Sequence, residues 1–152
     1  MPIVVGMLIL GLLGLAHYMA LYRLAHFIRF DGDRKRRAVL FTFLGLALIH
    51  VVEIAAIAVL FWTAEQLFWQ AGVPPEVSGW WDYHYIAFMT FTSLGFGDMD
   101  IHGPIRIVLG HIALGGFMVI TWSATFLYDV TRKVTDFTLE EDGQESGEAQ
   151  EA

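Results

Sequence analysis

The segment Thr90-Phe-Thr-Ser-Leu-Gly-Phe-Gly-Asp98 closes an apolar, aromatic run that begins at Trp80. A run of about 10–14 apolar residues between two longer runs is too short to cross a bilayer and is typical of a re-entrant helix. Glycines alternate with Phe96, so the backbone there can adopt conformations that are closed to residues with a Cβ. Such a backbone can point successive carbonyl oxygens in one direction, and it is tolerated at membrane depth only inside protein or along a watery cavity.

Three longer apolar runs accompany this segment, at Pro2–Tyr22, Ala38–Phe68 and Ile105–Tyr128. Each reaches the about 20 residues that a membrane-spanning helix needs. The second run exceeds that length, so it must tilt or protrude from the bilayer. The whole chain is 56% hydrophobic and 16% charged, with a mean hydropathy of +0.55, which disfavours a soluble globular protein. The first run lacks a basic start and a small-residue cleavage pattern, so we expect a retained helix rather than a secretory signal.

The net charge comes from one end of the chain. Residues 134–152 carry seven Asp and Glu residues and no Lys or Arg, which accounts for the whole net charge of −7. We expect this segment to be a solvated, mostly disordered tail. The acidic balance argues against nucleic acid as a partner. The absence of cysteine excludes disulfides, thiolate zinc sites and thiol catalysis.

Basic residues form two clusters, one after the first apolar run and one after the third. The first cluster comprises Arg23, Arg29, Arg34, Lys35, Arg36 and Arg37, and the second comprises Arg132 and Lys133. Because Lys and Arg are enriched on the cytoplasmic side of membrane proteins, we expect both clusters in the cytoplasm. Three crossings then place the N-terminus outside and the acidic tail inside.

Four copies of the Thr90–Asp98 segment around an axis would form stacked rings of carbonyl oxygens, which can replace the hydration shell of a monovalent cation. The stretch Thr92-Ser93-Leu94-Gly95-Phe96-Gly97-Asp98 resembles the potassium-channel filter, T-T-V-G-Y-G-D. The order of outer helix, turn, pore helix, filter and inner helix matches as well. The chain is similar to small bacterial ion channels built around a two-helix pore domain, over roughly residues 38–132.

This resemblance implies an all-α membrane protein of the potassium-channel pore fold, with three transmembrane helices, a re-entrant pore helix and a selectivity filter. It implies a homotetramer in the bacterial inner membrane, whose partners are K⁺, the lipid bilayer and further copies of the chain. We divide the chain into an additional N-terminal helix with a basic cytoplasmic linker (1–37), a pore domain (38–133) and the acidic tail (134–152).

The resemblance also assigns roles within the filter. The carbonyl groups of Ser93, Leu94, Gly95 and Phe96 would bind K⁺, and Gly97 completes the ion-binding filter. Ser93 stands where the family usually has threonine, Leu94 where it has valine and Phe96 where it commonly has tyrosine. These departures leave a potassium-like pattern and keep open a non-selective monovalent cation channel.

Residues around the filter would support it. In the family an aspartate at the position of Asp98 ties the outer mouth to the pore helix, and an aromatic donor stands near the position of Tyr85. The resemblance therefore implies a hydrogen bond between Tyr85 and Asp98, with Thr92 as a further support. In the third run, Gly115 and Gly116 stand at a depth where family members often have a gating glycine. A hinge and close helix packing are both open interpretations of these glycines.

His50 and Glu53 stand three residues apart on one face of the second run. Ionisable residues inside a membrane are costly and usually face protein or water. Three hypotheses follow: a pH-sensing or proton-linked gate, a structural hydrogen-bonded pair, or a metal site. A metal site needs further ligands, for which His17 and His111 are the nearby candidates.

The function that these observations imply is passive, selective conduction of K⁺ through a tetrameric carbonyl-lined filter. We expect no enzyme activity and no cofactor apart from the permeant K⁺ ions, because the chain contains no phosphate loop or nucleophile elbow. No span carries the regularly spaced arginines of a voltage sensor. The alternatives are a non-selective monovalent cation channel and a non-conducting membrane sensor or assembly subunit whose tail binds a partner.

Overall fold

The computed structural model of the chain describes residues 1–28, 35–67, 79–94, 101 and 103–151, and their side chains except at 35–36, 66–67 and 137–151. Every regular element in this part is a helix. The four helices are α1 (Pro2–Phe27), α2 (Lys35–Leu67), α3 (Trp80–Thr92) and α4 (Ile105–Glu151). The short helix α3 coincides with the apolar, aromatic run that the sequence predicted to be re-entrant.

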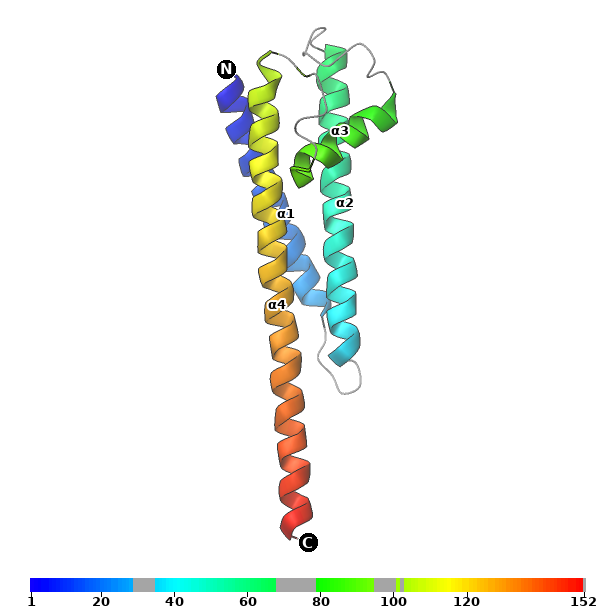
Figure 1. The fold of residues 1–152 in the computed structure, drawn as a ribbon, viewed down its shortest axis with the longest axis vertical. Coiled ribbons are helices and arrows are strands. Elements are labelled where there is room, and N and C mark those ends of the chain that lie inside the picture. Colours follow the sequence, from blue (N-terminus) through cyan, green and yellow to red (C-terminus); the bar gives the residue numbers. More distant parts are fainter. Residues whose placement is uncertain (29–34, 68–78, 95–100, 102, 152) are drawn as a thin grey trace.

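Three of the helices are long and apolar enough to cross a membrane, at Pro2–Phe27, Arg37–Glu65 and Ile105–Asp136. At most 33% of the most apolar window of each is buried inside the subunit. The remaining apolar surface therefore faces outward, as expected for helices that meet lipid or further copies. The N-terminus and α3 lie at one end of the bundle, and the end of α1, the start of α2 and the end of α4 lie toward the other (Figure 1).

Helix α4 is longer than the sequence predicted. We expected a mostly disordered segment at 134–152, but α4 continues as helix to Glu151. That prediction is corrected for a physical reason: low hydrophobicity rules out a buried face but does not prevent helix propagation. Glu, Gln and Ala favour helix, and extending a formed helix avoids the cost of nucleation.

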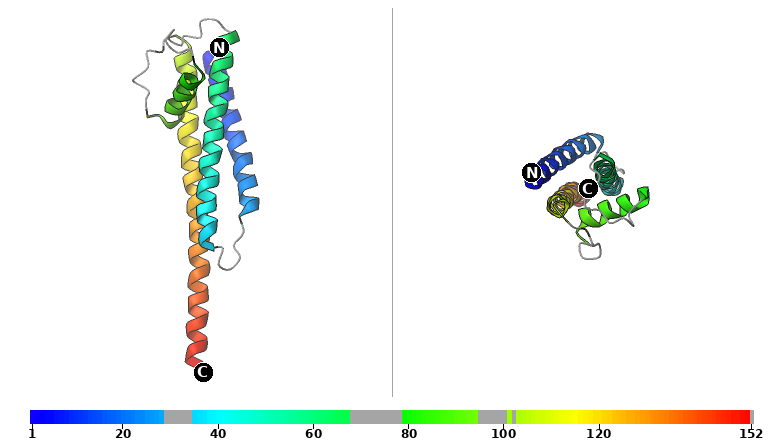
Figure 2. Two further views of the ribbon diagram at one scale, coloured as in Figure 1. Left: turned by 90° about the vertical axis from the view of Figure 1, so that its right-hand side faces the viewer. Right: turned by 90° about the horizontal axis from the view of Figure 1, so that it is seen from above.

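The helices pack so that α1 and α3 lie on different sides of the α2–α4 pair. Helix α1 contacts α4 and α2, whereas α3 contacts α2 and α4. The view along the bundle shows α3 crossing α2 and α4 on the side away from α1 (Figure 2). A shared apolar core includes Leu13 of α1, Ile57 of α2, Phe91 of α3 and Ile112 of α4. This core holds the short helix in place between the two longer ones.

Both ends of α3 are defined by local contacts. At its start, the Gly79 N–H donates to Asp82 Oδ2 at 2.9 Å. At its end, Ser93 adopts a left-handed conformation (φ 59°, ψ 15°) and its N–H donates to the Thr90 carbonyl. This turn stops the helix and redirects the chain immediately before the Gly-Phe-Gly sequence.

Candidate functional site

The C-terminal end of α3 is buried inside the subunit. The exposed fractions of Thr90 and Phe91 are 3% and 1%. The Thr92 hydroxyl donates to the Phe88 carbonyl at 2.8 Å, within the helix. The last turn of α3 is therefore fixed by its surroundings, and its free carbonyl groups carry the partial negative charge of a helix C-terminus.

Two members of the predicted filter lie within the described residues. Ser93 forms the left-handed turn after α3, and the side chain of Leu94 is 77% exposed on the isolated subunit. Gly95, Phe96 and Gly97 lie outside the described residues, as does Asp98. The Tyr85 side chain is half exposed on α3. The predicted Tyr85–Asp98 hydrogen bond therefore stays a prediction.

The two adjacent glycines of α4 lie at close helix contacts. A Cβ built on Gly116 would collide with the carbonyl oxygen of Phe91, a backbone atom of α3. A Cβ on Gly115 would lie 3.0 Å from Leu13 Cδ2 on α1. Both glycines thus permit close approach of a neighbouring helix, which supports the packing interpretation, and the hinge stays a prediction.

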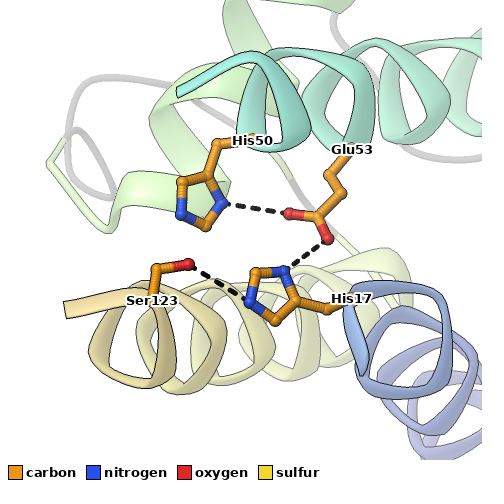
Figure 3. Close-up of polar contacts among 4 residues, drawn as sticks. All are labelled: His17, His50, Glu53 and Ser123. Carbon is orange, nitrogen blue, oxygen red and sulfur yellow. Dashed lines mark hydrogen bonds and ion pairs between the residues drawn. The ribbon is translucent and has the colours of Figure 1, made fainter. Parts of the chain in front are cut away.

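A polar cluster connects three of the helices inside the membrane-spanning region (Figure 3). His17 Nδ1 of α1 lies 2.8 Å from Glu53 Oε1 of α2, and His50 Nδ1 of α2 lies 3.0 Å from Glu53 Oε2. Ser123 Oγ of α4 lies 3.2 Å from His17 Nε2. His17 is fully buried, the exposed fractions of Glu53 and Ser123 are 8% and 5%, and that of His50 is 19%.

Every contact in this cluster can be satisfied at once. Each imidazole Nδ1–H donates to one oxygen of the Glu53 carboxylate, and the Ser123 hydroxyl donates to His17 Nε2. The rings of His17 and His50 stack, with centroids 5.4 Å apart and planes inclined by 10°. The carboxylate therefore joins α1 to α2 through its hydrogen bond with His17, and it bonds His50 within α2.

The sequence predicted only part of this cluster. The His50–Glu53 contact follows from helical spacing, and the structure confirms that the two side chains bond. His17 was named only as a candidate ligand, and its sole signal is that it interrupts the apolar run of α1. For Ser123 the sequence suggests a place in the inner cavity of a pore and gives no signal for a contact with His17. His111 lies elsewhere, half-buried on α4 against Gly6 of α1, and its Nδ1 donates to the Ile107 carbonyl at 2.7 Å.

Together, the three apolar helices able to span a membrane indicate a multi-pass membrane protein, in which the short helix α3 packs against α2 and α4. The family comparison gives the same class: an ion channel family model matches residues 47–133, more than half of the chain. The chain belongs to this potassium-channel-like ion channel family. The match includes most of α2, all of α3 and the membrane-spanning part of α4, whereas α1 lies outside it. No curated protein and no solved structure matches the chain.

Proposed function

We propose that this ion channel conducts K⁺ selectively through a filter formed by four copies of residues 93–97. The observation that carries the proposal is the position of the sequence Thr92-Ser-Leu-Gly-Phe-Gly-Asp98. It follows a helix that is too short to span, whose last turn is buried between α2 and α4. Backbone carbonyl rings at that depth supply the oxygen ligands that a dehydrated K⁺ ion requires.

Two features of α3 support this proposal. The negative end of its helix dipole is directed toward the segment that holds the filter, which favours a cation there. The close contact between Phe91 and Gly116 fixes that end of α3 against α4. One copy of the filter cannot surround an ion, so a functional pore requires several copies, and the family resemblance favours four.

The membrane orientation is also a proposal. The N-terminus and α3 lie at one end of the bundle, and the end of α1 and the start of α2, which the α1–α2 connection joins in the sequence, lie toward the other (Figure 1). With the basic residues of that connection in the cytoplasm, the filter opens to the outside and the end of α4 lies inside. This arrangement is the one expected for a bacterial inner-membrane channel.

Flux through liposomes tests the proposed function. Purified protein is reconstituted in vesicles that contain K⁺, and efflux is followed after dilution into a K⁺-free medium. We expect K⁺ efflux that Ba²⁺ blocks, because Ba²⁺ has nearly the size of K⁺ and binds the same carbonyl sites. Absence of flux at every pH and voltage tested would contradict the proposal, and a valinomycin control establishes that the vesicles are sealed.

Deletion of residues 134–152 separates a channel from a non-conducting assembly subunit. The deletion removes only the last three residues of the span Ile105–Asp136, among them the buried Val134, and leaves α3 and the core around Phe91 and Ile112 unchanged. We therefore expect basal K⁺ flux per reconstituted protein to survive. A subunit that acts only through partner binding by its tail would lose its role entirely. If the truncated protein is still helical and correctly assembled but conducts no K⁺, the pore depends on residues 134–152, which would contradict this prediction.

Replacement of Tyr85 by Phe tests the predicted support of the filter. The change removes one hydroxyl and leaves the ring, so the fold should be preserved. We expect K⁺ current to decline faster during sustained conduction, because the outer mouth loses its tie to the pore helix. Tyr22→Phe on the exposed face of α1 is the matched control. An identical decline in both variants would exclude the Tyr85–Asp98 bond.

A further inference from the structure

The donor atoms of the intramembrane polar cluster converge as the ligands of a metal ion do. One ligand atom from each of His17, His50 and Glu53 lies within 4.8 Å of the others. The two Nδ1 atoms already lie 2.8 and 3.0 Å from the carboxylate oxygens. Bonds of about 2.0–2.1 Å in a tetrahedral zinc site place neighbouring ligand atoms roughly 3.3 Å apart. We propose that this cluster binds one divalent transition-metal ion per chain, with zinc as the best fit.

The chemistry of the ligands selects the class of metal. Two imidazoles and one carboxylate suit zinc and other borderline transition metals, whereas Mg²⁺ and Ca²⁺ prefer oxygen ligands alone. Three protein ligands leave a fourth position for water. The ion-pair partners that the structure gives Glu53 are both histidines, which are neutral unless protonated. A bound cation would therefore compensate a buried carboxylate that no described lysine or arginine pairs with.

Ser123 supplies the outer contact that a histidine ligand needs. A metal-bound histidine usually donates its other ring N–H to a neighbouring acceptor, which fixes the tautomer. With a metal on His17 Nδ1, the proton moves to Nε2, which lies 3.2 Å from Ser123 Oγ. A hydroxyl can donate to this nitrogen in the metal-free form and accept from it in the metal-bound form. The Ser123–His17 hydrogen bond can therefore form in both the metal-free and the metal-bound protein.

The site is accessible from the surface of the subunit. His50 and Ser123 line a groove between α2 and α4 that also includes Phe43 and Ile120. Glu53 lines a second groove, between α1 and α2, together with Leu12. The cluster is thus flanked by a groove on each side of α2.

A metal at this position would tie the additional helix to the pore domain. His17 belongs to α1, which lies outside the family match, whereas His50 and Glu53 belong to the matched region. Coordination would replace the single hydrogen bond between α1 and α2, and the bond within α2, by stronger metal–ligand bonds. The proposal is independent of ion selectivity, because it concerns only these side chains.

Metal titration of the purified full-length protein tests the proposal. The protein is stripped with a chelator in detergent micelles and titrated with ZnCl₂, and CoCl₂ serves as a spectroscopic probe. We expect one Zn²⁺ bound per chain, a rise in thermal stability, and the visible absorption of tetrahedral Co²⁺. No uptake of Zn²⁺, or a stability that changes with pH but not with Zn²⁺, would overturn the proposal.

Conservative variants assign the binding to the cluster. His50→Gln and Glu53→Gln should each weaken Zn²⁺ affinity more than the roughly 10–100-fold expected for loss of the outer contact in Ser123→Ala. His111→Gln is the matched control, since it removes a half-buried histidine of α4 that lies outside the cluster and should leave the affinity unchanged. Wild-type binding in Glu53→Gln, or an equal loss in His111→Gln, would show that the ion binds elsewhere.

If the glutamine variants fold poorly, a cysteine variant provides an independent test of whether residue 50 binds the metal. His50→Cys exchanges one zinc ligand for another, and the natural chain contains no cysteine. The Co²⁺ complex of this variant should gain a thiolate-to-cobalt charge-transfer band that the wild-type complex lacks. Co²⁺ binding by His50→Cys without that band would place the metal away from residue 50 and contradict the proposal.

Discussion

Gly116→Ala should abolish most of the K⁺ flux and lower the stability of the protein. The new methyl group would meet the Phe91 carbonyl oxygen, a backbone atom that no rotamer change can move away. The end of α3 must therefore shift from α4, and the filter follows directly after that end. Overpacking of a core costs about 1–3 kcal/mol and occasionally more. Flux in liposomes and thermal unfolding in detergent measure the two effects.

Alanine variants of two further glycines of α4 provide comparisons for Gly116→Ala. At Gly110 an added Cβ meets nothing within 4 Å in the described subunit, so alanine should raise stability by about 0.5–1 kcal/mol through helix propensity. At Gly115 the contact is the end of the flexible Leu13 side chain, and we expect a small effect. If Gly116→Ala matches Gly110→Ala in flux and stability, the backbone contact does not position α3. A change of gating confined to Gly115→Ala would instead favour the predicted hinge.

Glu53→Ala should destabilise the packing of α1 on α2 more than any surface substitution does. The change removes the acceptor of both imidazoles and leaves the Nδ1–H of the fully buried His17 without its acceptor. A buried donor that is left without an acceptor costs about 1–3 kcal/mol. Unfolding by a denaturing detergent, followed by the loss of helical circular dichroism, measures the difference from wild type in metal-free protein.

An exposed ion pair provides the control for this comparison. Arg132 and Asp136 lie 3.7 Å apart on α4, and both side chains are more than 60% exposed. Because solvent screens such pairs, Asp136→Asn should change stability by only about 0–1 kcal/mol. Glu53→Gln, which retains one acceptor, should lie between the two. If Glu53→Ala costs no more than Asp136→Asn, the cluster does not hold α1 in place.

The sequence predicted the features that depend on local composition. The three spans follow from the length of the apolar runs, and the bounds of α3 follow from the aromatic run Trp80–Thr92. The position of α4 after Gly103 and Pro104 follows from the turn that they form, in which Gly103 has a φ of +79°. Hydropathy and turn residues are sufficient to predict these features, because the spans and the helix ends depend on neighbouring residues of the chain.

Contacts between helices that are far apart in the sequence could not be predicted from local composition. The spans α1 and α2 are apolar on every side, so no polar face indicates how each helix is rotated. His17 and Glu53 are 36 residues apart in the chain, and only the packing of α1 against α2 brings them together. The contact of Gly116 with Phe91 likewise depends on the depth at which α3 crosses α4. The continuation of α4 through the acidic segment is not predicted from hydrophobicity, because the low hydrophobicity of this segment indicates disorder although its Glu, Gln and Ala residues favour helix.

The selectivity of the pore is the central claim, and a reversal potential measures it most directly. Purified protein is placed in a planar bilayer with K⁺ on one side and Na⁺ at equal concentration on the other, with Gly95→Ala as the filter-disrupted control. A K⁺-selective filter predicts a reversal potential displaced strongly toward the K⁺ equilibrium value, and a Ba²⁺-sensitive current that the control variant lacks. A reversal potential near zero, with wild-type current carried equally by Na⁺, would contradict the claim and identify a non-selective cation channel.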